Sequence, residues 1–76
     1  MKELLLYIAR SLVQHPDQVI VTEVETGDEL TLELRVAPED MGRVIGRQGR
    51  IAKEIRTLIR SYAQRTGVKA SVDIVD

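Results

Sequence analysis

The sequence has no cysteine, no tryptophan and no phenylalanine, and its aromatic side chains are those of two tyrosines. Without cysteine, neither a disulfide nor a thiolate metal site can support the fold, which agrees with a reducing compartment. Modules that stack several bases on aromatic side chains, such as the RRM and OB folds, need more than Tyr7 and Tyr62 provide. The composition therefore argues against an aromatic stacking platform.

Groups suited to catalysis are equally scarce. The single histidine, His15, directly precedes a proline, where capping or solvent exposure is its expected role. The acidic residues have no histidine or cysteine neighbour at the spacing of metal ligands, and we find no nucleophile–base pair and no paired carboxylates. We therefore expect a protein that is not an enzyme and that holds no metal or other cofactor.

Long hydrophobic runs are also missing, so no segment approaches the length of a membrane span. The apolar run near the N-terminus is broken by Arg10 and lacks the length and the small-residue cleavage site of a signal peptide. With 76 residues, 43% of them hydrophobic, the chain can close one small globular core. We expect a single domain over residues 1–76 and a cytoplasmic location.

Charge is distributed unevenly along the chain, although the formal net charge is only −1. Residues 42–65 carry seven cations against one anion, whereas residues 1–41 carry three cations against nine anions. A surface polarised in this way attracts an anionic polymer to one face. The alternative is that these arginines form only a solvated helix face, but their clustering around a glycine loop favours binding.

The first half of the chain predicts a helix followed by a β-hairpin. Residues 3–14 show apolar side chains at helical spacing, and the residue before Pro16 disfavours a helical conformation. Residues 18–25 are rich in β-branched side chains, a turn follows at 26–28, and residues 30–36 alternate with a period of two. The side chains of the second strand expected to face the core are Leu30, Leu32, Leu34 and Val36.

The second half predicts two helices and a last strand. Pro38 suits a helix first turn, so a short helix is expected over 38–45, and a longer one over 50–65 ends before Gly67. Alternation over 68–74 predicts a strand, and the helical crossover places it parallel to the second strand. The expected class is α+β, in the order α-β-β-α-α-β, with a three-stranded mixed sheet packed on helices. The long helix is expected to bury Ile51, Ile55, Leu58, Ile59 and Tyr62.

Two glycines three residues apart, Gly46 and Gly49, enclose the long polar side chains of Arg47 and Gln48. Glycine has no Cβ, so the main chain can turn tightly there and a phosphodiester can come close to it. The helical pattern that starts at Arg50 adds unpaired N–H groups and the positive end of a helix dipole. The alternative, a helix cap followed by a plain turn, gives no reason for the two polar side chains.

This segment resembles the Gly-x-x-Gly core of the KH domain, a single-stranded nucleic-acid-binding module. An apolar pair at 44–45 precedes the loop, and Ala52 and Ile55 follow three and six residues beyond Gly49. Ala52 is a departure, because many KH domains carry a larger aliphatic residue there. The resemblance covers nearly the whole chain and points to small bacterial single-KH proteins of the KhpA (YlqC-like) type. The element order is similar to the type II, prokaryotic-style KH fold.

The resemblance implies non-catalytic binding of single-stranded RNA, with about four nucleotides across the glycine loop. Arg47 and Gln48 are expected to face outward and contact phosphate or ribose, which positions the ligand without reading its sequence. The apolar residues beside the loop are expected partly in the core and partly as a floor for bases. The expected RNA-binding residues are Arg43, Val44, Ile45, Gly46, Arg47, Gln48, Gly49, Arg50, Ile51 and Lys53.

The resemblance also implies homodimerisation, or pairing with a larger KH protein of the KhpB (Jag-like) kind, and a chaperone-like role in RNA-level regulation. The sequence adds that the long helix carries more apolar surface than one small sheet can easily bury. We expect part of that surface, around Ala52, Ile55 and Ile59, to be exposed in the monomer and covered by a second chain. The alternative is that all three residues belong to an ordinary core.

Two other functions remain open at this point. In one, the fold serves only as a dimerisation scaffold and the glycine loop is vestigial, although the cations Arg47 and Arg50 favour binding. In the other, the ligand is single-stranded DNA, because a loop that grips the sugar-phosphate backbone does not by itself distinguish the two nucleic acids.

Overall fold

The computed structural model describes residues 1–75, and Asp76 lies outside the described part. Its helices and strands are α1 (Lys2–Leu12), β1 (Ile20–Thr26), β2 (Glu29–Arg35), α2 (Met41–Ile45), α3 (Arg50–Arg65) and β3 (Lys69–Ile74). Short 3-10 turns lie at η1 (Pro16–Gln18), η2 (Pro38–Asp40) and η3 (Arg47–Gly49). The predicted α+β class and the order α-β-β-α-α-β are confirmed.

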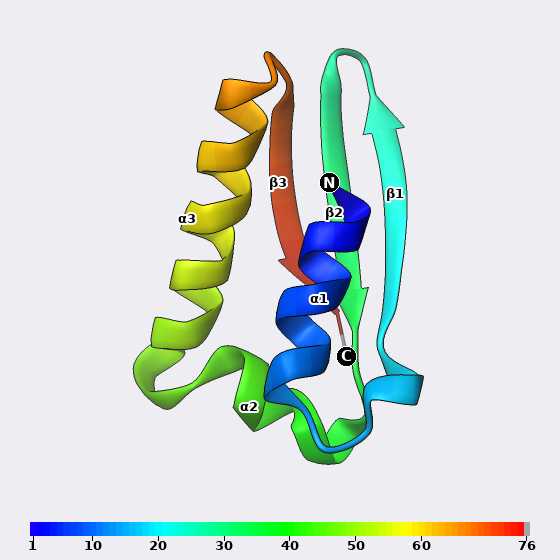
Figure 1. The fold of residues 1–76 in the computed structure, drawn as a ribbon, viewed down its shortest axis with the longest axis vertical. Coiled ribbons are helices and arrows are strands. Elements are labelled where there is room, and N and C mark those ends of the chain that lie inside the picture. The colour runs from blue at the N-terminus through cyan, green and yellow to red at the C-terminus, as the bar shows by residue number, and fades with distance from the viewer. Residues whose placement is uncertain (76) are drawn as a thin grey trace.

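Within residues 1–75, the strands form one mixed sheet in the order β1-β2-β3 (Figure 1). β1 pairs with β2 in antiparallel fashion, with Glu23 opposite Leu32, and β2 pairs with β3 in parallel, with Leu32 opposite Val72. The parallel pair follows from the crossover through α2 and α3, since a chain that returns through helices re-enters a sheet in the same direction. The tip of the β1–β2 hairpin and the α2–α3 loop lie at opposite ends of the molecule (Figure 1).

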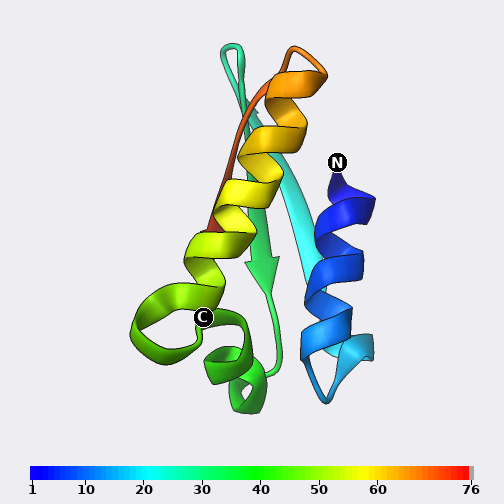
Figure 2. The same ribbon diagram turned by 60° about the vertical axis from the view of Figure 1, so that its left-hand side comes forward.

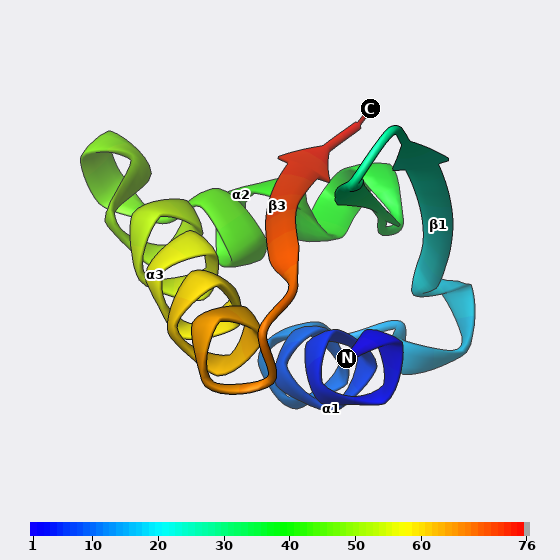
Figure 3. The same ribbon diagram turned by 90° about the horizontal axis from the view of Figure 1, so that it is seen from above.

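Helices α1 and α3 cover the same face of the sheet, which gives the molecule two layers (Figures 2 and 3). The core lies between the layers and is made of Leu5, Ala9, Val19, Val21, Leu32, Leu34, Val44, Ile55, Ile59 and Val72. The predicted core face of β2 is confirmed: Leu32 and Leu34 are fully buried, and the flanking Leu30 and Val36 are partly buried against the cluster. Each such aliphatic side chain contributes about 1.5–3 kcal/mol when fully buried.

The buried stripe of α3 differs from the predicted one. Leu58 and Tyr62 remain 55% and 43% exposed, so their predicted burial is wrong. The stripe that faces the sheet is made of Ala52, Ile55, Ile59 and Ala63. These residues recur at spacings of three and four, whereas Leu58 lies about 100° around the helix from Ile59. The two alanines let the helix backbone approach the sheet, which leaves the larger side chains outside.

This orientation of α3 about its axis also contradicts the expected partner surface. Ala52, Ile55 and Ile59 are only 4%, 2% and 0% exposed, so they belong to the core of this chain. They were expected at the surface because the sequence shows more apolar residues on this helix than a small sheet can bury. The surplus exists, but the structure places it at Leu58 and Tyr62, together with Tyr7 of α1.

Candidate nucleic-acid interface

The connection from α2 to α3 turns sharply at Gly46. Its φ of 76° and ψ of 176° end α2, and its N–H donates to the Gly42 carbonyl at 2.9 Å. A Cβ at this position would lie 2.9 Å from Cβ and 3.0 Å from the backbone nitrogen of Ile51, and still closer to Ile51 Cγ1. Glycine is therefore needed at Gly46 for two reasons, the backbone conformation and the close approach of Ile51.

The rest of the loop is a single 3-10 turn in a left-handed conformation. Gln48 has φ 57° and ψ 25°, and Gly49 has φ 75° and ψ 14°. Among the described residues, Gln48 is the one non-glycine with a positive φ, a conformation that costs an L-residue about 1 kcal/mol. The Gly49 N–H closes the turn on the Gly46 carbonyl at 3.2 Å, and the Arg50 N–H bonds to the Arg47 carbonyl.

Two backbone donors of this loop remain available to a ligand. Over residues 1–75, the N–H groups of Arg47 and Gln48 have no backbone acceptor, because the first bonds of the turn belong to Gly49 and Arg50. Directly after the loop, α3 runs for 16 residues with its N-terminal, positive end at the same place. The loop thus offers donors and a favourable dipole to an oxyanion such as a phosphate.

The side chains around the loop add positive charge. Arg47, Arg50 and Lys53 are exposed, as predicted for a ligand-facing group, and across the described residues none of the three takes part in an ion pair. Gln48 is exposed beside them. The acids of the β-hairpin tip lie at the far end of the molecule (Figure 1), so they do not neutralise this surface.

The apolar candidates beside the loop divide between core and surface. Val44 is fully buried, so its expected contact with RNA is corrected: its side chain supports the loop from within. Ile45 is 36% exposed and Ile51 is partly buried. Val44 and Ile45 point to different sides of α2 because successive residues of a helix are 100° apart. Ile45 and Ile51 therefore form an apolar border to the basic loop, and Val44 does not.

The family model described as KhpA/KhpB, KH domain matches residues 2–74. The chain belongs to the KhpA/KhpB family of KH domains. The match extends over all six helices and strands described above, and residues 46–49 lie within the matched range. The resemblance inferred from the sequence is therefore confirmed.

Curated relatives of this KH domain align over all or nearly all of their length. The chain is 55% identical over 75 residues to the RNA-binding protein KhpA of Clostridium acetobutylicum, covering 99% of this chain and 100% of the relative. It is 49% identical over 76 residues to the RNA-binding protein KhpA of Listeria monocytogenes serovar 1/2a, covering 100% of both chains. The KhpA of Chlamydia muridarum is 45% identical, covering 100% of this chain and 97% of the relative.

A solved structure shares the fold at low sequence identity. The Era protein of Aquifex aeolicus, crystallised with GDP and AlF4−, superposes with a TM-score of 0.64 at 20% identity. The match covers 95% of this chain, which spans 28% of the Era chain. At this identity the similarity concerns the fold alone.

The buried carboxylate of Asp40 is a feature of this KH domain that the sequence did not reveal. Asp40 is 0% exposed, and its two oxygens accept the backbone N–H groups of Gln14 and His15, each at 3.0 Å. Arg43 Nε lies 3.6 Å from Oδ1, and His15 Nε2 lies 3.6 Å from the exposed Glu39. Pro38-Glu39-Asp40 predicted only a helix first turn, because both backbone partners lie about 25 positions away in sequence.

The surroundings of Asp40 favour its charged form. Burial by itself raises the pKa of the Asp40 carboxyl. The two backbone N–H groups, together with the electrostatic influence of the nearby His15 ring and of the positively charged Arg43, outweigh burial and hold that pKa below its ordinary value. The carboxylate therefore fastens the start of α2, and with it the glycine loop, to the connection between α1 and β1.

Arg56 of α3 is a second residue whose position only the structure shows. Its Nε donates to the carbonyl of Val72 at 3.3 Å, so the guanidinium lies against the free edge of β3. In the sequence, Arg56 and Lys53 continue the same basic pattern. The structure separates them: Lys53 lies on the outer side of α3, beside Arg50 and Leu58, whereas Arg56 faces the sheet edge.

Two negative findings complete the description of residues 1–75. No helix among them has both the length and the apolar character that crossing a membrane would require. No group of acidic and histidine side chains in the same residues is arranged to hold a metal ion.

Proposed function

We propose that residues 1–76 act as one KH domain that binds single-stranded RNA through the Gly46–Gly49 loop without catalysing a reaction. The observation that carries this proposal is the loop itself: two backbone N–H groups without backbone partners, at the start of α3, surrounded by exposed cations. The relatives named RNA-binding protein KhpA, which match over their full length, support RNA as the ligand.

In this proposal the phosphate backbone lies across the loop and the bases lie beside it. The backbone N–H groups and the side chains of Arg47 and Gln48 donate hydrogen bonds to phosphate oxygens. Arg43, Arg50 and Lys53 add positive charge. Ile45 and Ile51 supply an apolar border for about four nucleotides. Backbone contacts dominate such a site, so sequence preference is shallow and the affinity of one domain is weak.

Fluorescence anisotropy with labelled single-stranded RNA and DNA of the same sequence tests this function. The proposal is supported if the parent binds RNA and reversal of the loop charge abolishes that binding. Binding of DNA alone would favour the DNA alternative. Absence of binding to both, with an intact fold, would favour a scaffold with a vestigial loop.

We further propose that two copies of the chain associate through the outer faces of α1 and α3. A shallow groove between these helices is lined by Leu4, Tyr7, Ile8, Leu58, Ser61, Tyr62 and Arg65. Tyr7, Leu58 and Tyr62 are 73%, 55% and 43% exposed, which makes this face the main exposed apolar area on the helical layer. Large exposed apolar side chains gathered on one face are typical of an interaction surface.

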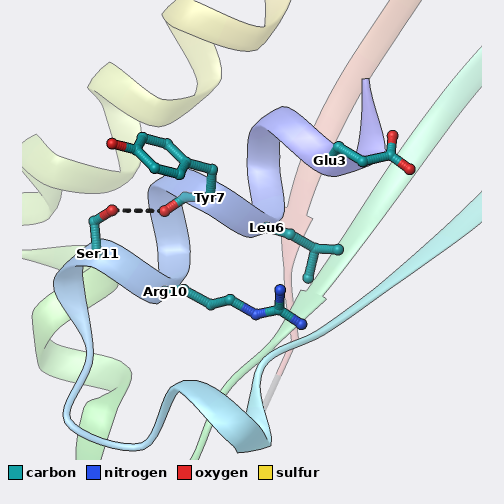
Figure 4. A pocket seen from close by; sticks show the side chains of 5 residues that line it. All are labelled: Glu3, Leu6, Tyr7, Arg10 and Ser11. Carbon is teal, nitrogen blue, oxygen red and sulfur yellow. Dashed lines mark hydrogen bonds between the residues drawn. The ribbon is translucent and has the colours of Figure 1, made fainter.

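Charge around the groove fits a second copy of the same chain. Figure 4 shows Glu3, Leu6 and Arg10 extending from α1 away from Tyr7 and Ser11, and of these residues it is Tyr7 that lines the α1–α3 groove. Arg65 lines the groove on α3, and Glu54 flanks Leu58. A two-fold arrangement brings the same patch of both copies together, so in this proposal Glu54 of one copy pairs with Arg65 of the other. A KhpB-type KH protein is the alternative partner, which the shared KhpA/KhpB family model makes a natural competitor.

Dimerisation suits the weak single site. Joining two RNA-binding loops in one particle raises the avidity for a longer RNA by a factor on the order of 10² to 10⁴ when both loops can be engaged. A small dimer with shallow sequence preference suits a chaperone-like role in RNA-level regulation in the cytoplasm, and we propose this role for the protein.

A further inference from the structure

Asp40 joins two parts of the chain that are distant in sequence. It is the one fully buried charged side chain among the described residues, and it stands at the N-cap of α2, the five-residue helix that leads into the glycine loop. Its side chain does not cap that helix. Instead both oxygens accept N–H groups from the α1–β1 connection, at Gln14 and His15. A carboxylate is the side chain that accepts two such bonds at once.

Arg43 meets the same carboxylate through one particular nitrogen. Its Nε lies 3.6 Å from Asp40 Oδ1, three residues along the chain, while its side chain stays 49% exposed. A guanidinium is a planar fork in which Nε and one terminal nitrogen share an edge, so contact through Nε leaves the other terminal nitrogen, Nη1, on the side away from Asp40. The helical bond from Gly46 N–H to Gly42 continues the turn, so Arg43 stands one turn before Gly46.

We propose that Asp40 is a positioning residue for RNA binding, which holds Arg43 by Nε so that a terminal nitrogen on the opposite edge of the guanidinium faces the phosphate backbone at the glycine loop. The inference rests on the proposed RNA-binding function. It predicts a change in RNA affinity opposite to the one that charge alone predicts for a substitution of Asp40. Charge alone predicts that removal of an anion from a basic surface strengthens RNA binding, whereas positioning predicts that loss of the Asp40 carboxylate weakens it.

The first experiment changes Arg43 and leaves the buried carboxylate in place. Arg43→Lys keeps the charge, but a single ammonium has no separate nitrogen to hold Asp40 while it contacts phosphate. We expect RNA binding, measured by fluorescence anisotropy, to weaken roughly three- to tenfold, the effect of about one charge-assisted hydrogen bond. The matched control is Arg60→Lys, since Arg60 is exposed on α3 away from the glycine loop and, within residues 1–75, takes part in no ion pair; it should change affinity by less than about twofold. Equal affinities of parent, Arg43→Lys and Arg60→Lys would overturn the inference.

The second experiment changes the carboxylate itself. Asp40→Asn is expected to weaken RNA binding although it removes a negative charge, and Glu39→Gln, at a neighbour whose side chain is 66% exposed, is expected not to weaken it. In an Arg43→Lys background, Asp40→Asn should bring no further loss, because both changes remove the same interaction. Independent, additive losses in this double-mutant cycle would assign Asp40 a structural role only and overturn the inference. Where Asp40→Asn proves too unstable to measure, the Arg43→Lys comparison decides alone.

Charge reversal of the loop, at Arg47 and Gln48, separates this inference from the proposed function. If the loop variant loses RNA binding while Arg43→Lys binds like the parent, the positioning role of Asp40 fails and the RNA-binding function stands. If the loop variant keeps full RNA binding, the proposed function fails and the role of Asp40 fails with it. Loss of binding in both, with the control variants unaffected, supports both statements.

Discussion

Gly46 and Ile51 approach so closely that no side chain larger than hydrogen fits at Gly46. A Cβ there would lie within 3.0 Å of the backbone nitrogen of Ile51 as well as against its side chain. The start of α3 therefore folds back onto the end of α2, and the loop between them is held by contact as well as by conformation. This contact links the glycine spacing in the sequence to the rigidity of the proposed binding loop.

The two loop glycines should differ in their tolerance of alanine. Gly49→Ala meets no atom within 4 Å and costs the left-handed backbone only, about 1 kcal/mol of unfolding free energy. Gly46→Ala adds a clash with Ile51 and should cost roughly 2–4 kcal/mol in total. Urea unfolding followed by circular dichroism measures both values. A Gly46→Ala variant as stable as Gly49→Ala would contradict the described loop geometry.

Charge reversal of the exposed loop side chains should abolish RNA binding and preserve the fold. In Arg47→Asp/Gln48→Asp, two carboxylates repel phosphate and compete for the loop N–H groups, while surface changes usually cost within about 0.5 kcal/mol of stability. The matched control is Arg60→Asp/Gln64→Asp, the same residue types, exposed near the other end of α3. This control should retain most of the binding. A loop variant that binds an RNA pool like the parent would show that the loop is not the site.

The salt dependence of RNA affinity should correspond to only a few ion pairs between the domain and phosphate. If two to four of the cations Arg43, Arg47, Arg50 and Lys53 touch phosphate, a plot of log affinity against log salt has a slope of roughly −1.5 to −3 per site, at about −0.7 per single-strand phosphate. Anisotropy titrations between low and physiological salt measure it. A slope near zero would remove the electrostatic contact from the mechanism, and a much steeper one would indicate a longer basic track such as that of a dimer.

Acid should destabilise the domain through Asp40. Because the folded state holds the pKa of Asp40 below its ordinary value, the carboxylate contributes stability that is fully present above the unfolded pKa of about 3.9. That contribution is lost as the pH falls below this value and through the lower folded pKa. Urea unfolding of the parent from pH 7 to pH 3 should show the loss.

Variants of two different aspartates serve as controls for this pH dependence of stability. Asp40→Asn should be less stable than the parent at pH 7 and should lose less stability on acidification, because the titrating group is gone. Asp17→Asn, at an exposed residue of the 3-10 turn η1, should follow the parent. An Asp40→Asn variant with the same pH profile as the parent would show that another group governs the acid response.

The element order and the loop were predictable because their causes are local. Glycine spacing marks the turn at Gly46 and Gly49, and alternation marks β2, since a strand exposes every second side chain. Parallel pairing of β3 followed from the crossover rule. These features depend on residues within a few positions of one another, so the sequence contains enough information to place them.

The rotation of α3 and the role of Asp40 were not predictable in the same way. Ile55, Leu58, Ile59 and Tyr62 together span more of the helix surface than the sheet covers, and apolarity alone does not say which edge is left out. The contact with the sheet decides, and it selects the narrower stripe that includes two alanines. Asp40 depends on backbone donors about 25 positions away, which no local pattern encodes.

The proposed dimer face gives opposite predictions for two adjacent residues of α3. Ile59 is fully buried, so Ile59→Glu places an unpaired charge in the core and should unfold the domain. Leu58 is 55% exposed beside Tyr62, so Leu58→Glu should leave a folded domain that sediments as a monomer and binds long RNA with lower avidity. Thr57→Glu, also exposed on α3 but outside the lining of the α1–α3 groove, is the control for added charge and should keep the parental oligomeric state.

Analytical ultracentrifugation with circular dichroism on the same samples distinguishes these outcomes. A parent protein that stays monomeric at high micromolar concentration, both alone and with a KhpB-type KH protein, would defeat the proposed interface. A parental dimer that Leu58→Glu leaves intact would move the contact away from the α1–α3 groove. Loss of the homodimer with retained pairing to a KhpB-type protein would separate two surfaces. Leu58 is next to the buried Ile59 in sequence, yet it lies outside the contact with the sheet. This pair of substitutions therefore tests both the orientation of α3 about its axis and the partner surface.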